Sequence, residues 1–483
     1  MKDGKTQILF AISECVPFAK SGGLADVGGA LPLALNRKRS VRASVIMPEY
    51  SSIPHEYLDK MEHVTHFEIK LGWRKKYCGI NKLKHRGTTF YFIDNKDYFG
   101  ADYLYGYGDY EAERFAFFSI AVLEAIPYLD EIPDIIHCHD WQTAMIPVLL
   151  KNRYAFLGIY EKTKTVFTIH NLRFQGMFNP DLMPDFFGFE RQMVDDGRAG
   201  TNGALNFMKG ALTYADAITT VSPTYSEEIL TIWGGEGLEQ ALASRKQDLY
   251  GILNGIDHTI FNPAKDPGIE ANFSLDDISG KYKCKSALQE EAGLPLREKV
   301  PLIGMIGRLT SQKGLDLVEH VMNDIMADDL QMIVLGTGEK RYSDMFQYFQ
   351  QLYPEKIRAF ITFDSGLADR IYAGSDMFLM PSLFEPCGLA QMISMAYGTV
   401  PIVRETGGLK DTVDSFNSDT GTGNGFSFSH YNAHDMLYTI RRALKYYEEY
   451  PAVWKKIQES GMKQDFSWKA SASNYVDLYT SLK

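Results

Sequence analysis

Charged residues beside glycines, placed where a strand passes into a helix, are the feature of this sequence with the clearest chemical meaning. Glu385 follows the apolar run Met377–Met380, and Pro386-Cys387-Gly388 then leads into a buried helix expected over Leu389–Tyr397. Free N–H groups at a helix N-terminus bind phosphate, whereas a carboxylate repels it. Glu385 is therefore suited to accept hydrogen bonds from sugar hydroxyls. On spacing alone, a Glu385 that only caps the helix is an equally good interpretation.

Two further loops of the second half carry residues suited to anions. Arg308 and Lys313 stand five residues apart after a strand expected at Pro301–Ile306. Arginine grips two phosphate oxygens and lysine supplies a compact charge, so together they suit a diphosphate. A second loop, Thr406-Gly407-Gly408, follows the strand expected at Val400–Val403 and enters another helix. A solvated basic loop is the alternative interpretation of the first.

A related loop follows the first strand, which we expect over Gln7–Ser13. It carries Lys20, the two glycines Gly22 and Gly23, and then Asp26 inside a helix expected from Gly22 to Leu35. Glycines let a ligand approach the backbone at this helix N-terminus. The loop matches neither the dinucleotide fingerprint nor the Walker loop, so neither class of nucleotide enzyme is indicated.

Polar residues also end two other expected strands of the first half. His137-Cys138-His139-Asp140-Trp141 ends one, and His170 follows Val166–Ile169. The two histidines of the first segment admit a zinc site, but no second ligand pair lies at zinc-finger spacing. A carboxylate next to an indole is more typical of carbohydrate binding or loop packing. A loop with five tyrosines, Tyr103 among them, suits sugar stacking or covers the core.

The elements that position these loops form repeated strand, glycine-bearing loop and helix units. This order predicts doubly wound α/β domains, whose ligands bind beyond the carboxyl ends of parallel strands. A chain of 483 residues is too long for one core. We expect domains over residues 1–250 and 251–464, with a C-terminal helical segment over 465–483 and the turn at Asn254-Gly255 marking the junction. The alternating region Val64–Asp94 predicts an antiparallel excursion.

Composition excludes several classes of partner. The net charge of −11 argues against nucleic acid and anionic membranes. The five cysteines are scattered and lack CxxC spacing, which indicates reduced thiols and a cytoplasmic protein. No apolar run is long enough to span a membrane or to act as a signal peptide.

Together the motifs resemble those of the bacterial glycogen synthases and the similar plant starch synthases. In chain order they are Lys20–Val27, His139-Asp140-Trp141, Thr168–Asn171, Asn254–Asp257, Gly307–Gly314, Phe384–Leu389 and Thr406–Leu409. The resemblance implies two Rossmann-like doubly wound domains facing a deep cleft, the GT-B arrangement, with the C-terminal helix returning to the first domain. It also implies transfer of glucose from ADP-glucose to the non-reducing 4-hydroxyl of an α-1,4-glucan, with retention of anomeric configuration.

The resemblance also assigns roles to residues. The catalytic set would be Lys20, His170, Arg308, Lys313 and Glu385. The nucleotide-sugar site would comprise Gly22, Gly23, Asp26, Asp140, Asn254, Phe363, Cys387, Gly388, Leu389, Thr406 and Gly407. Tyr103 and Trp141 would bind the acceptor, which is glycogen or a linear glucan. No metal or other cofactor is expected, because cationic side chains and backbone N–H groups would neutralise the leaving diphosphate.

Departures from related families leave alternatives open. Related transferases often carry a second glutamate eight residues after the first, where this chain has Ile393, as glycogen synthases do. Ser21 stands where threonine is more usual, and Phe363 offers the adenine a ring without a hydroxyl. The alternatives are a related GT-B enzyme that uses UDP-glucose or another acceptor, and a non-catalytic glucan-binding homologue. A glycogen phosphorylase would need pyridoxal phosphate and a much longer chain.

Overall fold

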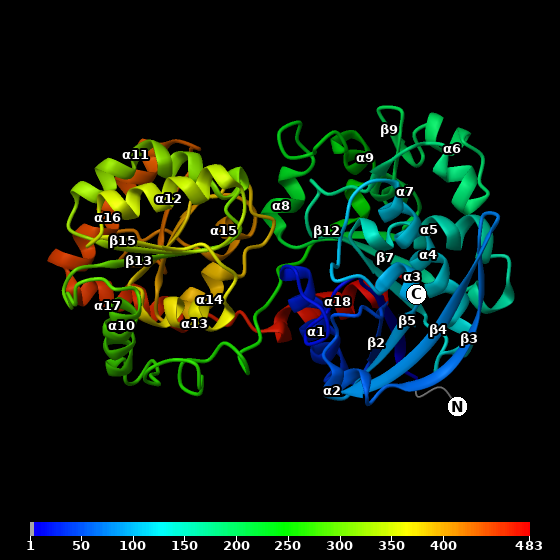
Figure 1. Cartoon of the computed structure of the whole chain (residues 1–483), viewed down its shortest axis with the longest axis horizontal. Coiled ribbons are helices and arrows are strands. Elements are labelled where there is room, and N and C mark those ends of the chain that lie inside the picture. The colour runs from blue at the N-terminus through cyan, green and yellow to red at the C-terminus, as the bar shows by residue number, and fades with distance from the viewer. Residues whose placement is uncertain (1–3) are drawn as a thin grey trace. The chain divides into compact units, whose positions relative to one another are not determined.

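The computed structural model describes residues 4–483, which divide into two compact units (Figure 1). Unit 1 comprises residues 4–254 and 468–483, and unit 2 comprises residues 255–467. The predicted boundaries, 250/251 and 464/465, lie a few residues from these. Each unit is built on a largely parallel sheet with helices on both faces, as the predicted α/β class requires.

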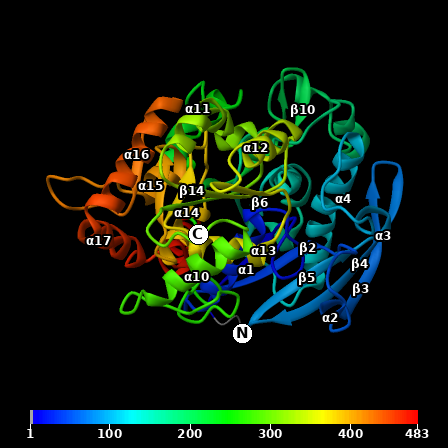
Figure 2. The ribbon, with the colours of Figure 1, turned by 60° about the vertical axis from the view of Figure 1, so that its left-hand side comes forward.

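Unit 1 contains a nine-stranded sheet with the order β12-β11-β7-β6-β1-β2-β5-β4-β3. Its strands are β1 Thr6–Ala11, β2 Val41–Pro48, β3 Glu62–Leu71, β4 Arg74–His85, β5 Thr88–Asp94, β6 Ile135–His139, β7 Lys164–Ile169, β11 Ala217–Thr220 and β12 Leu249–Gly251. Pairing is parallel from β12 to β5, and β4 is antiparallel to both of its neighbours (Figure 2). The antiparallel excursion predicted over Val64–Asp94 is thereby confirmed. A small sheet contains β8 Met177–Phe178, β9 Gly200–Thr201 and β10 Ala204–Asn206.

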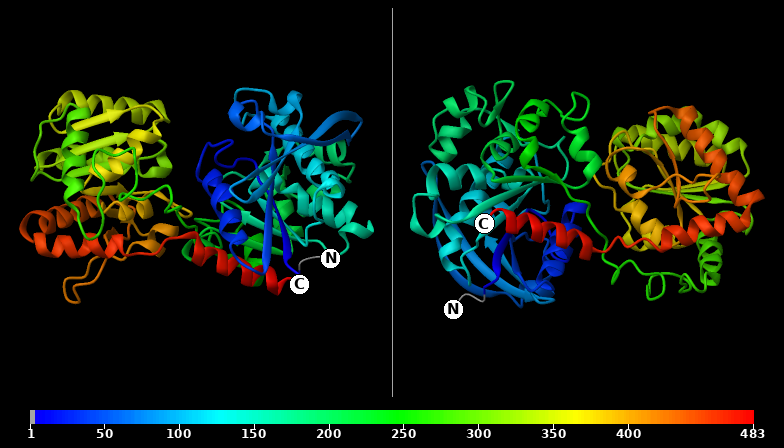
Figure 3. Two further views of the ribbon diagram at one scale, coloured as in Figure 1. Left: turned by 90° about the horizontal axis from the view of Figure 1, so that it is seen from below. Right: turned by 180° about the vertical axis from the view of Figure 1, so that it is seen from behind.

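The helices of unit 1 bury the sheet on both faces because their apolar residues recur at helical spacing. They are α1 Gly23–Asn36, α2 His55–Leu58, α3 Lys96–Phe99, α4 Asp109–Ala125, α5 Met145–Leu149, α6 Gln192–Asp195, α7 Phe207–Tyr214, α8 Pro223–Glu228, α9 Glu239–Ser244 and α18 Trp468–Ser481. The last helix, α18, lies beside α1 (Figure 3) and buries Tyr475 and Tyr479 in the core of unit 1.

Unit 2 contains a six-stranded parallel sheet with the order β15-β14-β13-β16-β17-β18. Its strands are β13 Leu302–Ile306, β14 Gln331–Leu335, β15 Ile357–Phe360, β16 Met377–Met380, β17 Val400–Arg404 and β18 Phe426–Phe428. Its helices are α10 Ser279–Glu291, α11 Leu315–Ala327, α12 Lys340–Leu352, α13 Ser365–Gly374, α14 Ala390–Ala396, α15 Gly407–Thr412, α16 Ala433–Glu449 and α17 Pro451–Met462.

Alternation along β14 divides the core of unit 2 between two layers of helices. Met332 and Val334 pack with residues of α11, α12 and α16, whereas Ile333 and Leu335 pack with residues of α10 and α13. Successive side chains of a strand point to opposite faces, so a strand buried on both faces is continuously apolar. Because these strands are continuously apolar, the polar residues predicted for the site lie in the loops at the carboxyl ends of the strands.

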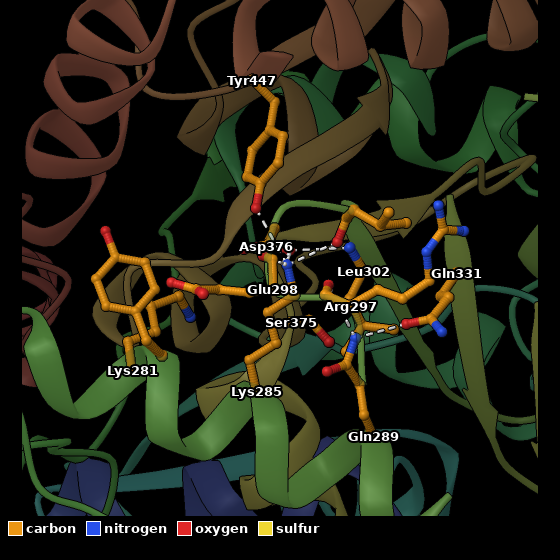
Figure 4. Close-up of polar contacts among 12 residues, drawn as sticks. Lys281, Lys285, Gln289, Arg297, Glu298, Leu302, Gln331, Ser375, Asp376 and Tyr447 are labelled. Carbon is orange, nitrogen blue, oxygen red and sulfur yellow. Dashed lines mark hydrogen bonds and ion pairs between the residues drawn. The ribbon is translucent and has the colours of Figure 1, made fainter. Parts of the chain in front are cut away.

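A buried ion pair ties α10 to the strand starts of unit 2 (Figure 4). Lys285 Nζ lies 2.7 Å from Asp376 Oδ2, and the two side chains are 3% and 10% exposed. The ammonium also donates to the carbonyl oxygen of Val300 at 2.7 Å and contacts the Tyr447 hydroxyl at 3.1 Å. Asp376 accepts a 2.9 Å hydrogen bond from the backbone N–H of Leu302, the first residue of β13. The pair therefore aligns β13 and β16 with α10 and α16.

Substitution of Lys285 by methionine should destabilise the protein by about 3–5 kcal/mol, because it removes the cation in direct contact with the buried Asp376 carboxylate. Adding Asp376→Asn should recover part of the loss, since the amide carries no charge. The measurement is the free energy of unfolding in urea. Arg297→Met removes an exposed ion pair with Asp329 in the same unit and should cost less than about 1 kcal/mol. Equal losses for Lys285→Met and Arg297→Met would contradict the role of the buried pair.

Candidate functional site

Three loops meet at the carboxyl ends of β13, β16 and β17 in unit 2, and they touch through their backbones. A Cβ atom at Gly314, whose φ is +69°, would lie 2.0 Å from the carbonyl oxygen of Pro381. A Cβ atom at Gly407, whose φ is +44°, would lie 2.0 Å from the carbonyl oxygen of Glu385. Both the backbone angles and the short approaches require glycine. The N–H of Gly408 donates to the same Glu385 carbonyl at 3.1 Å, which holds the second loop against the third.

Lys313 and Glu385, predicted separately from two motifs, are in direct contact. Lys313 Nζ lies 2.6 Å from Glu385 Oε2, and Ser382 Oγ donates to the same oxygen at 3.0 Å. Lys313 reaches this position because η7, a 3₁₀ turn over Ser311–Lys313, follows the β13 loop. The pair is largely buried, with side chains 23% and 10% exposed. A lysine held in this way presents its charge at a fixed place beside the Glu385 carboxylate.

The remaining predicted residues of unit 2 differ in exposure. Gly388 has a φ of +69° and leads with Leu389 into α14, while Cys387 is buried and the amide nitrogen of Gln391 donates to its carbonyl at 3.1 Å. Thr406 is buried at the start of α15. Arg308 is exposed in the loop after β13. Phe363 is 79% exposed and follows the end of β15 at Phe360 by three residues.

In unit 1, the glycine loop after β1 is held by two carboxylates. Lys20 Nζ lies 2.8 Å from Asp26 Oδ1, so the exposed lysine is tethered to the first turn of α1. The N–H of Ser21 donates to a carboxylate oxygen of Glu14, a buried residue that precedes the loop. Burial raises the pKa of Glu14 above its usual value, and it raises the pKa of Asp26 as well. Gly22 and Gly23 lie between these two anchors at the start of α1.

Asp140 and His170 are also brought together, at the carboxyl ends of the neighbouring strands β6 and β7. Asp140 Oδ1 accepts a 2.8 Å hydrogen bond from the backbone N–H of His170. Burial, with a smaller contribution from the Glu14 carboxylate, raises the pKa of Asp140 to about 7, although hydrogen bonds from the His170 and Asn171 backbones favour the ionised form. Burial lowers the pKa of His170 to about 3, so its imidazole is neutral. Asp140 takes a φ of +56°, which turns its side chain at the strand end.

The zinc alternative for His137 and His139 finds no support in the contacts of these residues. His137 Nδ1 lies 2.7 Å from the Tyr479 hydroxyl of α18, and its Nε2 lies 2.6 Å from Thr168 Oγ1. His139 Nδ1 lies 2.9 Å from His170 Nε2. Over residues 4–483, His, Cys, Asp and Glu side chains form no group of three able to hold a metal ion.

The predicted site residues Trp141, Tyr103 and Asn254 differ in how far they are packed against the rest of unit 1. The ring of Trp141 packs against Phe115 and Phe178 at centroid distances of 5.1 and 5.5 Å, and it is only partly exposed. Tyr103 is 45% exposed on the loop before α4. Asn254 is the last residue of the first segment of unit 1 and is buried.

Glu14 and Ser382 were given no role in the predicted site, and His139 was considered only as a zinc ligand and as part of a family motif. Each lies at or shortly after a strand end, within a few residues of a predicted site residue, and this position was the available signal. Their contacts join residues that are not adjacent along the chain, such as His139 with His170. Such pairing follows from the order of strands in the sheet and is not visible in local spacing.

Comparison with known proteins assigns both units to families. Residues 7–244 match the family model of the starch synthase catalytic domain, and residues 288–460 match the model of group 1 glycosyl transferases. A glycogen synthase of Geobacillus thermodenitrificans is 51% identical over 476 residues, covering 99% of this chain and 98% of that protein. One from Bacillus subtilis is 51% identical over 474 residues, covering 98% of this chain and 97% of that protein.

Solved structures agree with this assignment. The catalytic domain of starch synthase IV from Arabidopsis thaliana, bound to ADP and acarbose, has a TM-score of 0.91 at 34% identity and covers 99% of both chains. Sucrose-phosphate synthase from Thermosynechococcus elongatus has a TM-score of 0.62 at 16% identity, which shows a shared fold only. Because the similarity to glycogen synthases extends over almost the entire sequence, the chain belongs to the glycogen and starch synthase family of GT-B glycosyltransferases.

Proposed function

We propose that the chain transfers glucose from ADP-glucose to the non-reducing end of an α-1,4-glucan and retains the anomeric configuration. The observation that carries this proposal is the 51% identity to a glycogen synthase along almost the entire chain. The ADP bound to the related starch synthase IV supports an adenine nucleotide over UDP-glucose as the donor. All five cysteines are buried, and none of them forms a disulfide within residues 4–483, which supports a reducing, cytoplasmic location. None of the helices within residues 4–483 has the length and apolar character needed to cross a bilayer.

We assign Arg308 and Lys313 to the leaving diphosphate. Departure of ADP places negative charge on its β-phosphate while the sugar becomes oxocarbenium-like. Lys313 is fixed by its 2.6 Å contact with Glu385, whereas Arg308 is exposed and can grip two oxygens. The backbone N–H groups that follow Gly388 and Gly407 at two helix N-termini add further donors. Each well-placed group of this kind contributes about 3–4 kcal/mol to stabilisation of the transition state.

Glu385 is assigned to the hydroxyls of the transferred glucose. Its contacts with Lys313 and Ser382 both use Oε2. Within the described chain, no hydrogen bond reaches Oε1, which therefore keeps its lone pairs for sugar hydroxyls. Because Oε2 is already engaged by a cation, the carboxylate presents less repulsion to the neighbouring phosphate. We assign Asp140 and His170 to the same sugar and Lys20 to the phosphate.

Retention of configuration is proposed without a covalent glycosyl-enzyme intermediate. A retaining glycosidase uses a carboxylate as the nucleophile, and that carboxylate must be free to attack. Here Oε2 of Glu385 is engaged by Lys313 and Ser382 and its Oε1 is assigned to the sugar hydroxyls, while Asp140 Oδ1 accepts a hydrogen bond from the His170 backbone. We therefore assign neither carboxylate as a nucleophile.

The proposed function is tested by incubating the protein with glycogen and either ADP-glucose or UDP-glucose, and by measuring nucleotide release and glucan extension. We expect ADP-glucose to be preferred and the rate to be unchanged in EDTA, since cationic side chains supply the charge at the diphosphate. A higher rate with UDP-glucose would favour the alternative donor. Loss of activity in EDTA, restored by a divalent ion, would show that a metal takes part. No transfer from either donor would favour a glucan-binding role.

Replacement of Arg308 or Lys313 by alanine should lower kcat by about 10²–10³, because each removes a charge that stabilises the leaving group. Lys313→Arg should retain more activity than Lys313→Ala because it keeps a cation beside Glu385. Lys340→Ala is a matched control: it removes an exposed lysine of the same unit that pairs with Asp344. Steady-state kinetics together with circular dichroism provide the measurement. Near-normal turnover of Arg308→Ala and Lys313→Ala would contradict the assignment to the diphosphate.

The pH dependence of kcat/KM should follow the ionisation of the Asp140 carboxyl group. Because burial raises its pKa to about 7, the carboxylate is lost as the pH falls through this value in the free enzyme. If the ionised form accepts a hydrogen bond from the sugar, kcat/KM should decline below about pH 7. Asp140→Asn cannot ionise, so its lower but measurable kcat/KM should not show this decline. A profile that keeps the same inflection in Asp140→Asn would assign the ionisation to another group.

A further inference from the structure

Three neutral histidines of unit 1 lie close together, and the contacts of their ring nitrogens indicate which nitrogen carries the proton in two of them. His137 and His139 lie on β6, and His170 directly follows the adjacent strand β7. His139 Nδ1 lies 2.9 Å from His170 Nε2. A hydrogen bond between two neutral imidazoles needs a proton on one nitrogen and a lone pair on the other. Two tautomeric arrangements therefore satisfy the contact. In one of them His170 Nδ1 carries a proton and can donate a hydrogen bond, and in the other it carries a lone pair and can accept one.

The other ring nitrogen of His139 distinguishes between them. His139 is 0% exposed, and within residues 4–483 no polar atom lies in hydrogen-bond reach of its Nε2. If Nε2 carried the proton, a donor would be buried without an acceptor. Buried N–H groups are left unpaired more rarely than buried acceptors, because the desolvated donor has nothing to replace water. The proton of His139 is therefore placed on Nδ1, from which it points to His170.

The charge state of the three rings agrees with this order. Burial lowers the pKa of His170 to about 3. Burial, with repulsion from the neighbouring imidazoles, lowers the pKa of His137 and His139 well below the usual value. Each ring consequently carries one proton near neutral pH. Since Nε2 of His170 accepts from His139, the single proton of His170 must lie on Nδ1.

We infer that His139 is a positioning residue that holds His170 in the Nδ1–H tautomer, so that His170 presents a hydrogen-bond donor at the carboxyl end of β7. The acceptor of this hydrogen bond, an oxygen atom of the transferred sugar, is inferred from the proposed function, whereas the tautomer of His170 does not depend on that function. A neutral donor binds that oxygen without placing a positive charge beside a sugar that becomes oxocarbenium-like. The opposite tautomer would present a lone pair and would require a donor from the sugar.

His137 offers a matched control on the same strand. It is also fully buried, but its two nitrogens contact hydroxyl groups, those of Tyr479 at 2.7 Å and Thr168 at 2.6 Å. Hydroxyls can donate or accept, so they do not dictate a tautomer to the ring. Neither nitrogen of His137 contacts His170. His137→Asn should therefore change stability and leave the tautomer of His170 as it is.

The direct test is ¹⁵N NMR of the full-length protein labelled at histidine, in which protonated and bare ring nitrogens resonate in separate regions. Signals of His170 are assigned by their loss in His170→Ala. We expect wild type and His137→Asn to show His170 protonated at Nδ1. His139→Leu, which has no donor, should release His170 to the Nε2–H form. Protonation of His170 at Nε2 in the wild type overturns the inference, even if His139→Leu fails to fold.

Kinetics supply a second readout. His139→Leu should lower kcat by about 10²-fold, as expected when an imidazole takes the wrong tautomer and a donor is lost. His139→Asn places an amide N–H near the former Nδ1 and should restore kcat to within about 10-fold of wild type. Equal kcat values for folded His139→Leu and His139→Asn would overturn the inference. If the wild type transfers no glucose, the proposed function fails while the NMR result still decides the tautomer.

Discussion

Backbone-to-backbone packing of three loops is the constraint on which the candidate site of unit 2 depends. At Gly314, Gly407 and Gly408, a Cβ atom would lie 2.0 Å from a carbonyl oxygen of a neighbouring loop. The loops can approach this closely only because these positions lack side chains. Their closeness brings Lys313, after β13, within 2.6 Å of Glu385, after β16. The positions of the charged groups are thus set by glycines that carry no chemistry themselves.

Both lysines predicted to bind phosphate are paired with a carboxylate of their own unit. Lys313 contacts Glu385 and Lys20 contacts Asp26. A paired cation is less costly to shield from water than an isolated one, and its side chain is already ordered before a ligand arrives. In a protein with a net charge of −11, these two lysines are held at fixed places by carboxylates of their own units. Binding of an anion there would depend on these local cations, because the net charge of the protein repels anions.

Local spacing was sufficient to predict the strands, the glycine loops and the α/β class, because each depends on residues close in sequence. The strands expected over Val166–Ile169 and Val400–Val403 lie within β7 and β17, and the excursion over Val64–Asp94 was expected from its alternation. The contacts between Glu14 and Ser21, between His139 and His170, and between Lys285 and Asp376 were not predicted. The last two contacts depend on which strands and helices are neighbours. The spacing of apolar residues along the sequence does not specify which elements are neighbours. The roles proposed for the site residues stay predictions.

The position of α18 has a consequence for how the protein is made. Unit 1 consists of two segments, 4–254 and 468–483, and the whole of unit 2 is inserted between them. A ribosome therefore completes unit 2 before it releases the helix that covers part of the core of unit 1. Until Tyr475 and Tyr479 arrive, the nascent first unit leaves exposed the apolar surface and the His137 side chain that they bury. The segment synthesised first is thus the one that finishes folding last, and the waiting interval is the time needed to translate unit 2.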